Sequence, residues 1–222
     1  CSYLMSFILN PCRNYVRDWM HTLVSNGVAG THLACVCQAL DANGIPLTII
    51  SAYSHKFVLP RCRGGKPSDL FFKPELMSTD HVRHFANDVL GMVTILYCFL
   101  VEKVRPLNVL EKTVACFEYL YQILCILRRG DINEAISATL QGLIVKHNAL
   151  FLELYGNRVA KIKFHHMYHL ARDMLYLLGC LSCFPTERKN KEAIAVSTAT
   201  DCTVERTSVI AFLQRTLNHW NC

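Results

Sequence analysis

Residues 90–101, LGMVTILYCFLV, decide the fold class because they form the longest apolar run of the chain. Asp88 precedes the run, and Glu102 and Lys103 close it. A helix that spans a membrane needs roughly twenty apolar residues, and this run has twelve. The run therefore predicts a buried core helix, and we expect no contact with a membrane.

The segments after this run continue the helical pattern. Ser78-Thr79-Asp80 is typical of a helix start, and the helix that it opens is expected to end before Pro106. Amphipathic or apolar stretches of helical spacing then cover residues 107–129, 131–155 and 160–178, with shorter ones at 186–195 and 204–220. Long helices joined by short connections favour an antiparallel helical bundle, so the predicted fold class is mainly α.

Local signals mark the ends of these helices. Arg128 and Arg129 precede Gly130, as at many helix C-termini. Asp131 with Glu134 resembles a capping box that starts the next helix. These signals predict a tight turn between two long helices.

The first 75 residues are less regular. Residues 13–25 have helical spacing, and Thr31 is a suitable N-cap for a second helix that ends at Asn43-Gly44. Residues 47–53 are short and β-branched, which predicts a strand. Residues 60–74 are rich in Pro, Gly and basic side chains and are expected to form a loop.

The composition restricts the protein class. Apolar residues make up 52% of the 222 residues and charged residues 18%, which excludes intrinsic disorder. The net charge is 23 − 17, or +6, which permits a polyanionic partner without requiring one. The chain starts at Cys1 without a recognisable secretory leader, so we expect a piece of a longer intracellular protein, nuclear or cytoplasmic, with reduced cysteines.

Three short motifs stand out from ordinary helix sequence. They are DWMH at residues 18–21, KIKFHHMYHL at residues 161–170 and CFPTERKNK at residues 183–191. In their order and rough spacing they resemble the catalytic part of CACTA-type (En/Spm-like) DNA transposases.

The resemblance implies a ribonuclease-H-like core in which acidic residues hold two Mg²⁺ or Mn²⁺ ions. Asp18 would be the second acid and metal ligand, and Glu187 the third. Residues 1–75 would form the end of that core with its basic loop, residues 76–178 a helical insertion, and residues 179–222 the return to the core with a helical tail. Two divalent ions would stabilise both the attacking and the leaving oxygen of a phosphoryl displacement.

The resemblance also implies a set of neighbouring residues. Arg188 and Lys189 would meet DNA phosphates beside the third acid, and strand transfer would imply pairing of subunits. His21, His165 and His169 would lie near the site as positioning groups. The first acid of the family pattern is missing, because none of the seventeen residues before Asp18 is acidic. We therefore expect a transposase-derived fragment that does not cut DNA by itself.

Other interpretations of the same residues stay open. The cluster Arg61, Arg63 and Lys66 is either a solvated loop or a phosphate-contacting surface. The alternative to a transposase-derived fragment is a non-enzymatic helical interaction or scaffold protein.

A third hypothesis is a zinc-stabilised helical domain. Its ligands would be Cys180, Cys183, His165 and His169, of which the two histidines stand four residues apart.

Overall fold

The structure, a computed structural model, describes residues 16–58, 80–82, 84–131, 133–179 and 182–183. All regular structure in these residues is helical, which confirms the prediction of a mainly α protein. The chain divides into two compact units, Cys1–Leu181 and Ser182–Cys222. The helices described below belong to the first unit, which extends across the expected boundary between residues 75 and 76.

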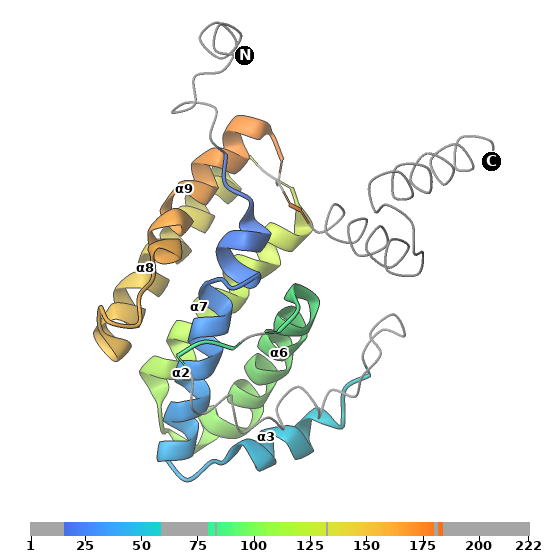
Figure 1. Cartoon of the computed structure of the whole chain (residues 1–222), viewed down its shortest axis with the longest axis vertical. Helices are drawn as coiled ribbons and strands as arrows, with labels where there is room; N and C mark the ends of the chain where they lie inside the picture. The colour runs from blue at the N-terminus through green and yellow to red at the C-terminus, as the bar shows by residue number, and fades with distance from the viewer. Residues whose placement is uncertain (1–15, 59–79, 83, 132, 180–181, 184–222) are drawn as a thin grey trace, which may run out of the picture. The chain divides into compact units, whose positions relative to one another are not determined.

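Three long helices that follow one another form one side of this unit. They are α7 (Glu111–Arg129), α8 (Glu134–Tyr155) and α9 (Ile162–Leu177), and each packs against the next. Figure 1 shows them running side by side. Gly130 ends α7 with φ of 77°, a conformation that suits glycine, and only a short turn leads to α8. The predicted succession of long helices with tight turns is thus confirmed for α7, α8 and α9.

A second group of helices packs against α7. Helix α2 (Val28–Ala42) is buried along most of its length and contacts both α6 (Ala86–Phe99) and α7. Helix α3 (Leu47–Ser54) contacts α6. Figure 1 shows α2 in front of α7, with α6 to its right and α3 at the lower right. The core therefore lies where α2 and α6 pack against α7, and where α7 packs against α8.

The apolar run at residues 90–101 is part of this core, as predicted. Its side chains Met92, Leu96 and Phe99 are almost completely buried. The helix continues beyond Phe99 as one π-helical turn, η2 (Leu100–Val104), and one 3₁₀ turn, η3 (Arg105–Leu107). Pro106 lies in the first turn of η3, where its missing N–H costs nothing.

One segment of the described residues, Met20–Ala42, is long and apolar enough to cross a membrane, with a mean hydropathy of 1.2. It consists of the π-helical turn η1 (Met20–Val24) followed by α2. In this structure 78% of its most apolar window is buried by the rest of the protein. A core helix has the same composition, so this segment is weak evidence for a membrane.

The prediction of a strand at residues 47–53 was wrong, because these residues form α3. Ile50, Tyr53 and Ser54 are buried together, while Ile49 is 48% exposed. This spacing of three and four residues places one apolar face on α6, and that packing overrides the preference of β-branched residues for strands.

Three predicted helix boundaries also differ. Thr31 lies inside α2, which begins at Val28, and it is therefore not an N-cap. The cap of α8 is Asn133 rather than Asp131, since its Oδ1 accepts the N–H of Ile136 at 2.9 Å. Helix α6 begins at Ala86, not near residue 78.

A tertiary contact explains the late start of α6. The backbone N–H of Val82 donates to the carbonyl oxygen of Gly30 on α2 at 3.1 Å. A Cβ atom at position 30 would lie 2.6 Å from the ring of His81, so only glycine fits there. Residues 80–82 are thus held against α2 in a non-helical conformation.

Candidate functional site

The residues before η1 meet α9 along a polar seam. Lys163 on α9 donates from Nζ to the carbonyl oxygens of His21 at 2.7 Å and Ser25 at 2.9 Å. These carbonyls lie in and just after η1, where a positive charge is favourable. The seam therefore joins the DWMH motif to the start of the KIKFHHMYHL motif.

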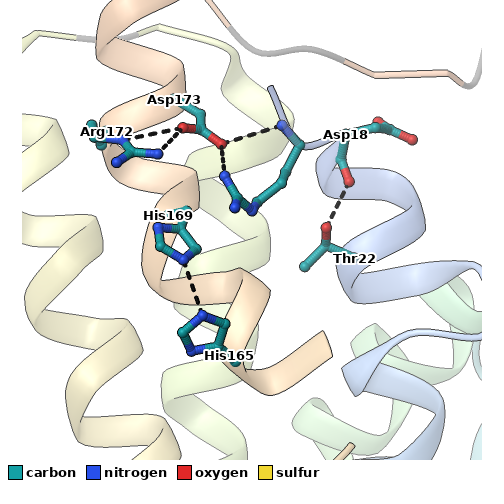
Figure 2. A network of polar contacts seen from close by, with 7 residues as sticks. Asp18, Thr22, His165, His169, Arg172 and Asp173 are labelled. Carbon is teal, nitrogen blue, oxygen red and sulfur yellow. Dashed lines mark hydrogen bonds and ion pairs between the residues drawn. The ribbon is translucent and has the colours of Figure 1, made fainter. Parts of the chain in front are cut away.

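A buried ion pair holds the other end of this seam (Figure 2). Asp173 on α9 accepts hydrogen bonds from the backbone N–H of Arg17 at 3.2 Å and from its Nη1 at 3.1 Å. Arg172 donates to the second carboxylate oxygen from Nε and Nη2. The side chain of Asp173 is 6% exposed and that of Arg17 16% exposed. This pair connects residues 156 positions apart.

Asp18 caps the first turn of the chain after Arg17. Its two oxygens accept the N–H groups of Met20 and His21, each at 3.2 Å, and its Oδ2 also contacts Nδ1 of His21. The Asp18 carbonyl accepts the hydroxyl of Thr22 at 2.8 Å, as Figure 2 shows. The Asp18 side chain is only 11% exposed. The carboxylate therefore serves the local backbone, as N-cap acids do.

His165 and His169 face each other one helical turn apart on α9. Their Nε2 atoms lie 3.2 Å apart (Figure 2), so one ring donates and the other accepts. Burial lowers the pKa of His169, and the positive charges of Arg17 and Arg172 lower it further. Burial and the positive charge of Arg17 also lower the pKa of His166. Both shifts disfavour the charged form of these two rings.

The structure thus brings the segment of Asp18 and His21 beside the helix that carries His165 and His169. The remaining predicted site residues lie outside the described residues: Glu187, Arg188, Lys189, Arg61, Arg63 and Lys66. Cys180, from the zinc hypothesis, lies outside them too. Asp18 and Glu187 as a pair of metal ligands stay a prediction.

A second polar cluster, which the sequence reasoning missed, lies in the core between α2, α7 and α8. Its members are His32 on α2, Cys116 on α7, and His147 with Asn148 on α8, and all are buried. Nε2 of His147 lies 3.1 Å from Nδ1 of His32, and Sγ of Cys116 donates to the His147 carbonyl at 3.7 Å. We call these four residues the core His–Cys cluster.

The hydrogen bonds of this cluster fix its proton positions. Asn148 donates from Nδ2 to the Phe164 carbonyl at 3.0 Å, so its Oδ1 faces Nδ1 of His147 at 3.0 Å and accepts a hydrogen bond from the N–H there. Nε2 of His147 is then the acceptor, and Nδ1 of His32 donates to it. Nε2 of His32 is left buried without a hydrogen-bond partner, which costs about 1–3 kcal/mol.

Burial keeps the cluster uncharged at neutral pH. Desolvation lowers the pKa of His147 to about 4 and that of His32 well below its ordinary value. Desolvation also raises the pKa of the Cys116 thiol to about 12, with a smaller contribution from Cys35. Aromatic rings surround His32, with the ring centroids of Phe117 and Phe151 at 5.1 and 5.2 Å.

One signal in the sequence points to the cluster. Ile144, His147, Asn148 and Phe151 occupy one stripe of α8 at spacings of three and four residues. Two polar residues on an otherwise apolar stripe must find partners inside the core. Neither their partner on α2 nor Cys116 on α7 follows from that spacing.

Comparisons with known proteins found no matching family model, no matching curated protein and no matching solved structure.

Proposed function

We propose that the chain is a transposase-derived DNA-binding domain that contacts phosphates through α9 and does not cut DNA by itself. The observation that carries the proposal is the stripe of cationic and titratable side chains on α9, in the motif that resembles the transposase family. We define this α9 basic face as Lys161, His165, His169 and Arg172.

The α9 basic face suits a polyanion in its geometry. Its residues recur every three or four positions from Lys161, the N-cap residue of α9, to Arg172, a rise of about 16 Å along a helix. DNA carries one negative charge per ~1.7 Å of its axis, so this length faces several phosphates. Lys161, His165 and Arg172 are exposed, and the acid on this helix, Asp173, is buried and paired with arginines. The N-terminus of α9 adds a further positive partial charge.

The hydrogen bonds that Asp18 accepts support the proposal that the chain does not cut DNA by itself. Both carboxylate oxygens accept backbone N–H groups, and the ring of His21 lies against one of them. Two divalent ions need several carboxylate oxygens with available lone pairs. Asp18 supplies a single carboxylate whose two oxygens already accept backbone N–H groups, so we derive no metal-dependent step from it.

The cysteines fit the expected reducing compartment, nuclear or cytoplasmic. Cys35, Cys37, Cys98, Cys116 and Cys125 are free thiols. DNA binding would make the nucleus or a nucleoid the working location.

The first experiment measures binding of a fluorescent DNA duplex by anisotropy at several salt concentrations. We expect affinity in the range of non-specific binding, Kd of about 10⁻⁴–10⁻⁶ M at physiological salt, with a steep salt dependence. Lys161→Ala and Arg172→Ala should each weaken binding and reduce the salt slope by about one. Lys103→Ala on η2 and Lys146→Ala on α8 remove equally exposed charges elsewhere and should change little.

A second measurement separates binding from cutting. Supercoiled plasmid incubated with the protein and Mg²⁺ or Mn²⁺ should stay intact, and Asp18→Asn should bind the duplex as well as the wild type does. If the wild type nicks the plasmid and Asp18→Asn does not, Asp18 is a metal ligand. The proposal that the chain does not cut DNA by itself would then be refuted. Equal loss of affinity in Lys103→Ala and Arg172→Ala would refute the assignment of the α9 basic face.

A second candidate function is a non-enzymatic helical interaction or scaffold protein. It is favoured by the structural use of both acids at the seam, with Asp18 capping η1 and Asp173 paired with Arg17. This function predicts no binding of the duplex at low salt. Self-association, which strand transfer also implies, would be measured by light scattering after gel filtration, with and without DNA.

A further inference from the structure

The core His–Cys cluster has the geometry of a metal site. One ring nitrogen from His32, one from His147 and Sγ of Cys116 all lie within 4.8 Å of one another. Around a single ion with metal–nitrogen bonds near 2.0 Å and metal–sulfur bonds near 2.3 Å, such atoms lie roughly 3.3–3.8 Å apart. Nε2 of His147 and Nδ1 of His32 are already 3.1 Å apart. Small side-chain shifts would therefore complete a three-ligand site.

The surroundings of His147 also match those of a metal-binding histidine. Such histidines donate their other ring N–H to a nearby oxygen, which fixes the tautomer and the ring orientation. Here Nδ1 of His147 donates to Oδ1 of Asn148, and the Phe164 carbonyl fixes the Asn148 amide. The ring is thus held with its Nε2 lone pair directed at His32.

A purely structural role leaves one feature unexplained. A hydrogen-bonded pair of histidines accounts for three of the four ring nitrogens, but Nε2 of His32 has no partner and is fully buried. Apolar side chains would fill the same volume without that cost. The pair of histidines is therefore an unfavourable way to fill this core, and the adjacent Cys116 thiol supplies a third ligand if an ion occupies the cluster.

We propose that His32, Cys116 and His147 bind one d¹⁰ transition-metal ion, Cu⁺ or Zn²⁺, in the core between α2, α7 and α8. Imidazole and thiolate are the ligands that these two ions share. On binding, the Cys116 thiol releases its proton to solvent and forms the metal–sulfur bond. The histidines stay neutral and release no proton: His147 coordinates through its Nε2 lone pair, and His32 coordinates through Nδ1 after its ring proton moves to Nε2.

Charge favours Cu⁺ when only these three residues are ligands. One thiolate neutralises a monovalent ion, whereas Zn²⁺ would keep a net charge of +1 among Phe117, Phe151 and Phe164. An uncompensated charge in an apolar core is very unfavourable. Zinc therefore requires a second thiolate; Cys35, one helical turn after His32 on α2, would have to move toward the cluster to supply it.

The cluster has no exposed surface, and this determines how the ion would be loaded. His32, Cys116 and His147 are each 0% exposed, so an ion would be bound while the chain folds, as in many metal-dependent domains. The experiment therefore unfolds the full chain in guanidinium chloride. The chain is then refolded anaerobically under reducing conditions, with Cu⁺ in one arm and Zn²⁺ in the other. The metal content is measured by mass spectrometry after removal of unbound ions.

We expect about one ion per chain in at least one arm, and X-ray absorption of that protein should show a mixed shell of nitrogen and one or two sulfurs. Cys116→Ser should lose the ion, and Asn148→Ala should weaken binding by about 10–100-fold by releasing the His147 ring. Cys125→Ser, on the same helix and not part of the cluster, is the matched control and should bind normally. Cys35→Ser should abolish Zn²⁺ binding and leave Cu⁺ binding intact.

Three outcomes would overturn the proposal. The first is wild-type protein that refolds, as judged by circular dichroism, but retains neither ion. The second is binding that Cys116→Ser leaves unchanged, and the third is a metal shell that lacks either sulfur or nitrogen. The absorption spectrum of the wild type decides the question even if a variant fails to fold. Failure of DNA binding would not affect this site, because none of its residues belongs to the α9 basic face.

Discussion

Asp173→Ala should be among the most destabilising single substitutions at the seam between Arg17 and α9. The carboxylate accepts four hydrogen bonds, two from Arg17 and two from Arg172. Hydrogen bonds to charged groups contribute about 1.5–3 kcal/mol each. Asp173→Ala removes the two that the part-buried Arg17 donates, so we expect a loss of about 2–4 kcal/mol.

The two arginines should contribute very differently. Arg172 is 69% exposed, and exposed ion pairs contribute about 0–1 kcal/mol. We therefore expect Arg172→Ala to cost less than ~1 kcal/mol. The double variant Arg17→Met with Asp173→Leu replaces the buried pair by apolar side chains. It should recover most of the stability, since such replacements are often neutral.

The assay is a double-mutant cycle on Arg17 and Asp173. Urea unfolding followed by far-UV circular dichroism gives the free energy of unfolding of each variant, provided that the transition is two-state. A coupling free energy above ~2 kcal/mol is expected for residues in one network. If Asp173→Ala costs less than ~1 kcal/mol, or if the two single effects simply add, the reasoning about the buried pair is refuted.

Three further predictions concern the core, the cap and the pH dependence. Leu96→Ala and Leu124→Ala should each lower the free energy of unfolding by about 2–5 kcal/mol, because both side chains are buried in packed helices; thermal melts within error of the wild type would contradict this. Asp18→Ala should cost about 0.5–2 kcal/mol and Asp18→Asn much less, since Asn also caps a helix; equal losses in urea unfolding would exclude the capping role. Burial holds the pKa of His147 at about 4, below its ordinary 6.5, so the unfolded chain takes up a proton that the native state does not. Stability should be full above pH ~6.5 and should fall as the pH drops toward 4, by about 1.4 kcal/mol per pH unit from this residue. Urea midpoints of metal-free protein across that pH range should show a shallower slope in His147→Gln, and an unchanged slope would contradict the burial argument.

The long helices were predictable from the sequence because their signals are local. Apolar residues at spacings of three and four, with Gly130 after two arginines, are enough to predict α7 and its end at Arg129, although α7 starts at Glu111 and not at residue 107. The apolar run around Leu96 likewise indicated a buried helix, which the structure contains. The same local reasoning failed at residues 47–53, where contact with α6 selects helix over strand.

The residues of the candidate sites were also predictable only where they are neighbours along the chain. The sequence singled out Asp18 and the histidines of α9, because short motifs are visible as neighbours along the chain. It gave no sign that Asp173 would pair with Arg17, 156 positions away, or that His32 would meet His147 across 115 positions.

Composition and periodicity determined that this chain is helical and which faces of its helices are apolar. The tertiary structure alone decided where polar groups are buried, because a buried charge or imidazole must find its partner on another helix. Helical spacing fixes the face on which such a group lies, but only the packing of α2, α7, α8 and α9 determines what it meets.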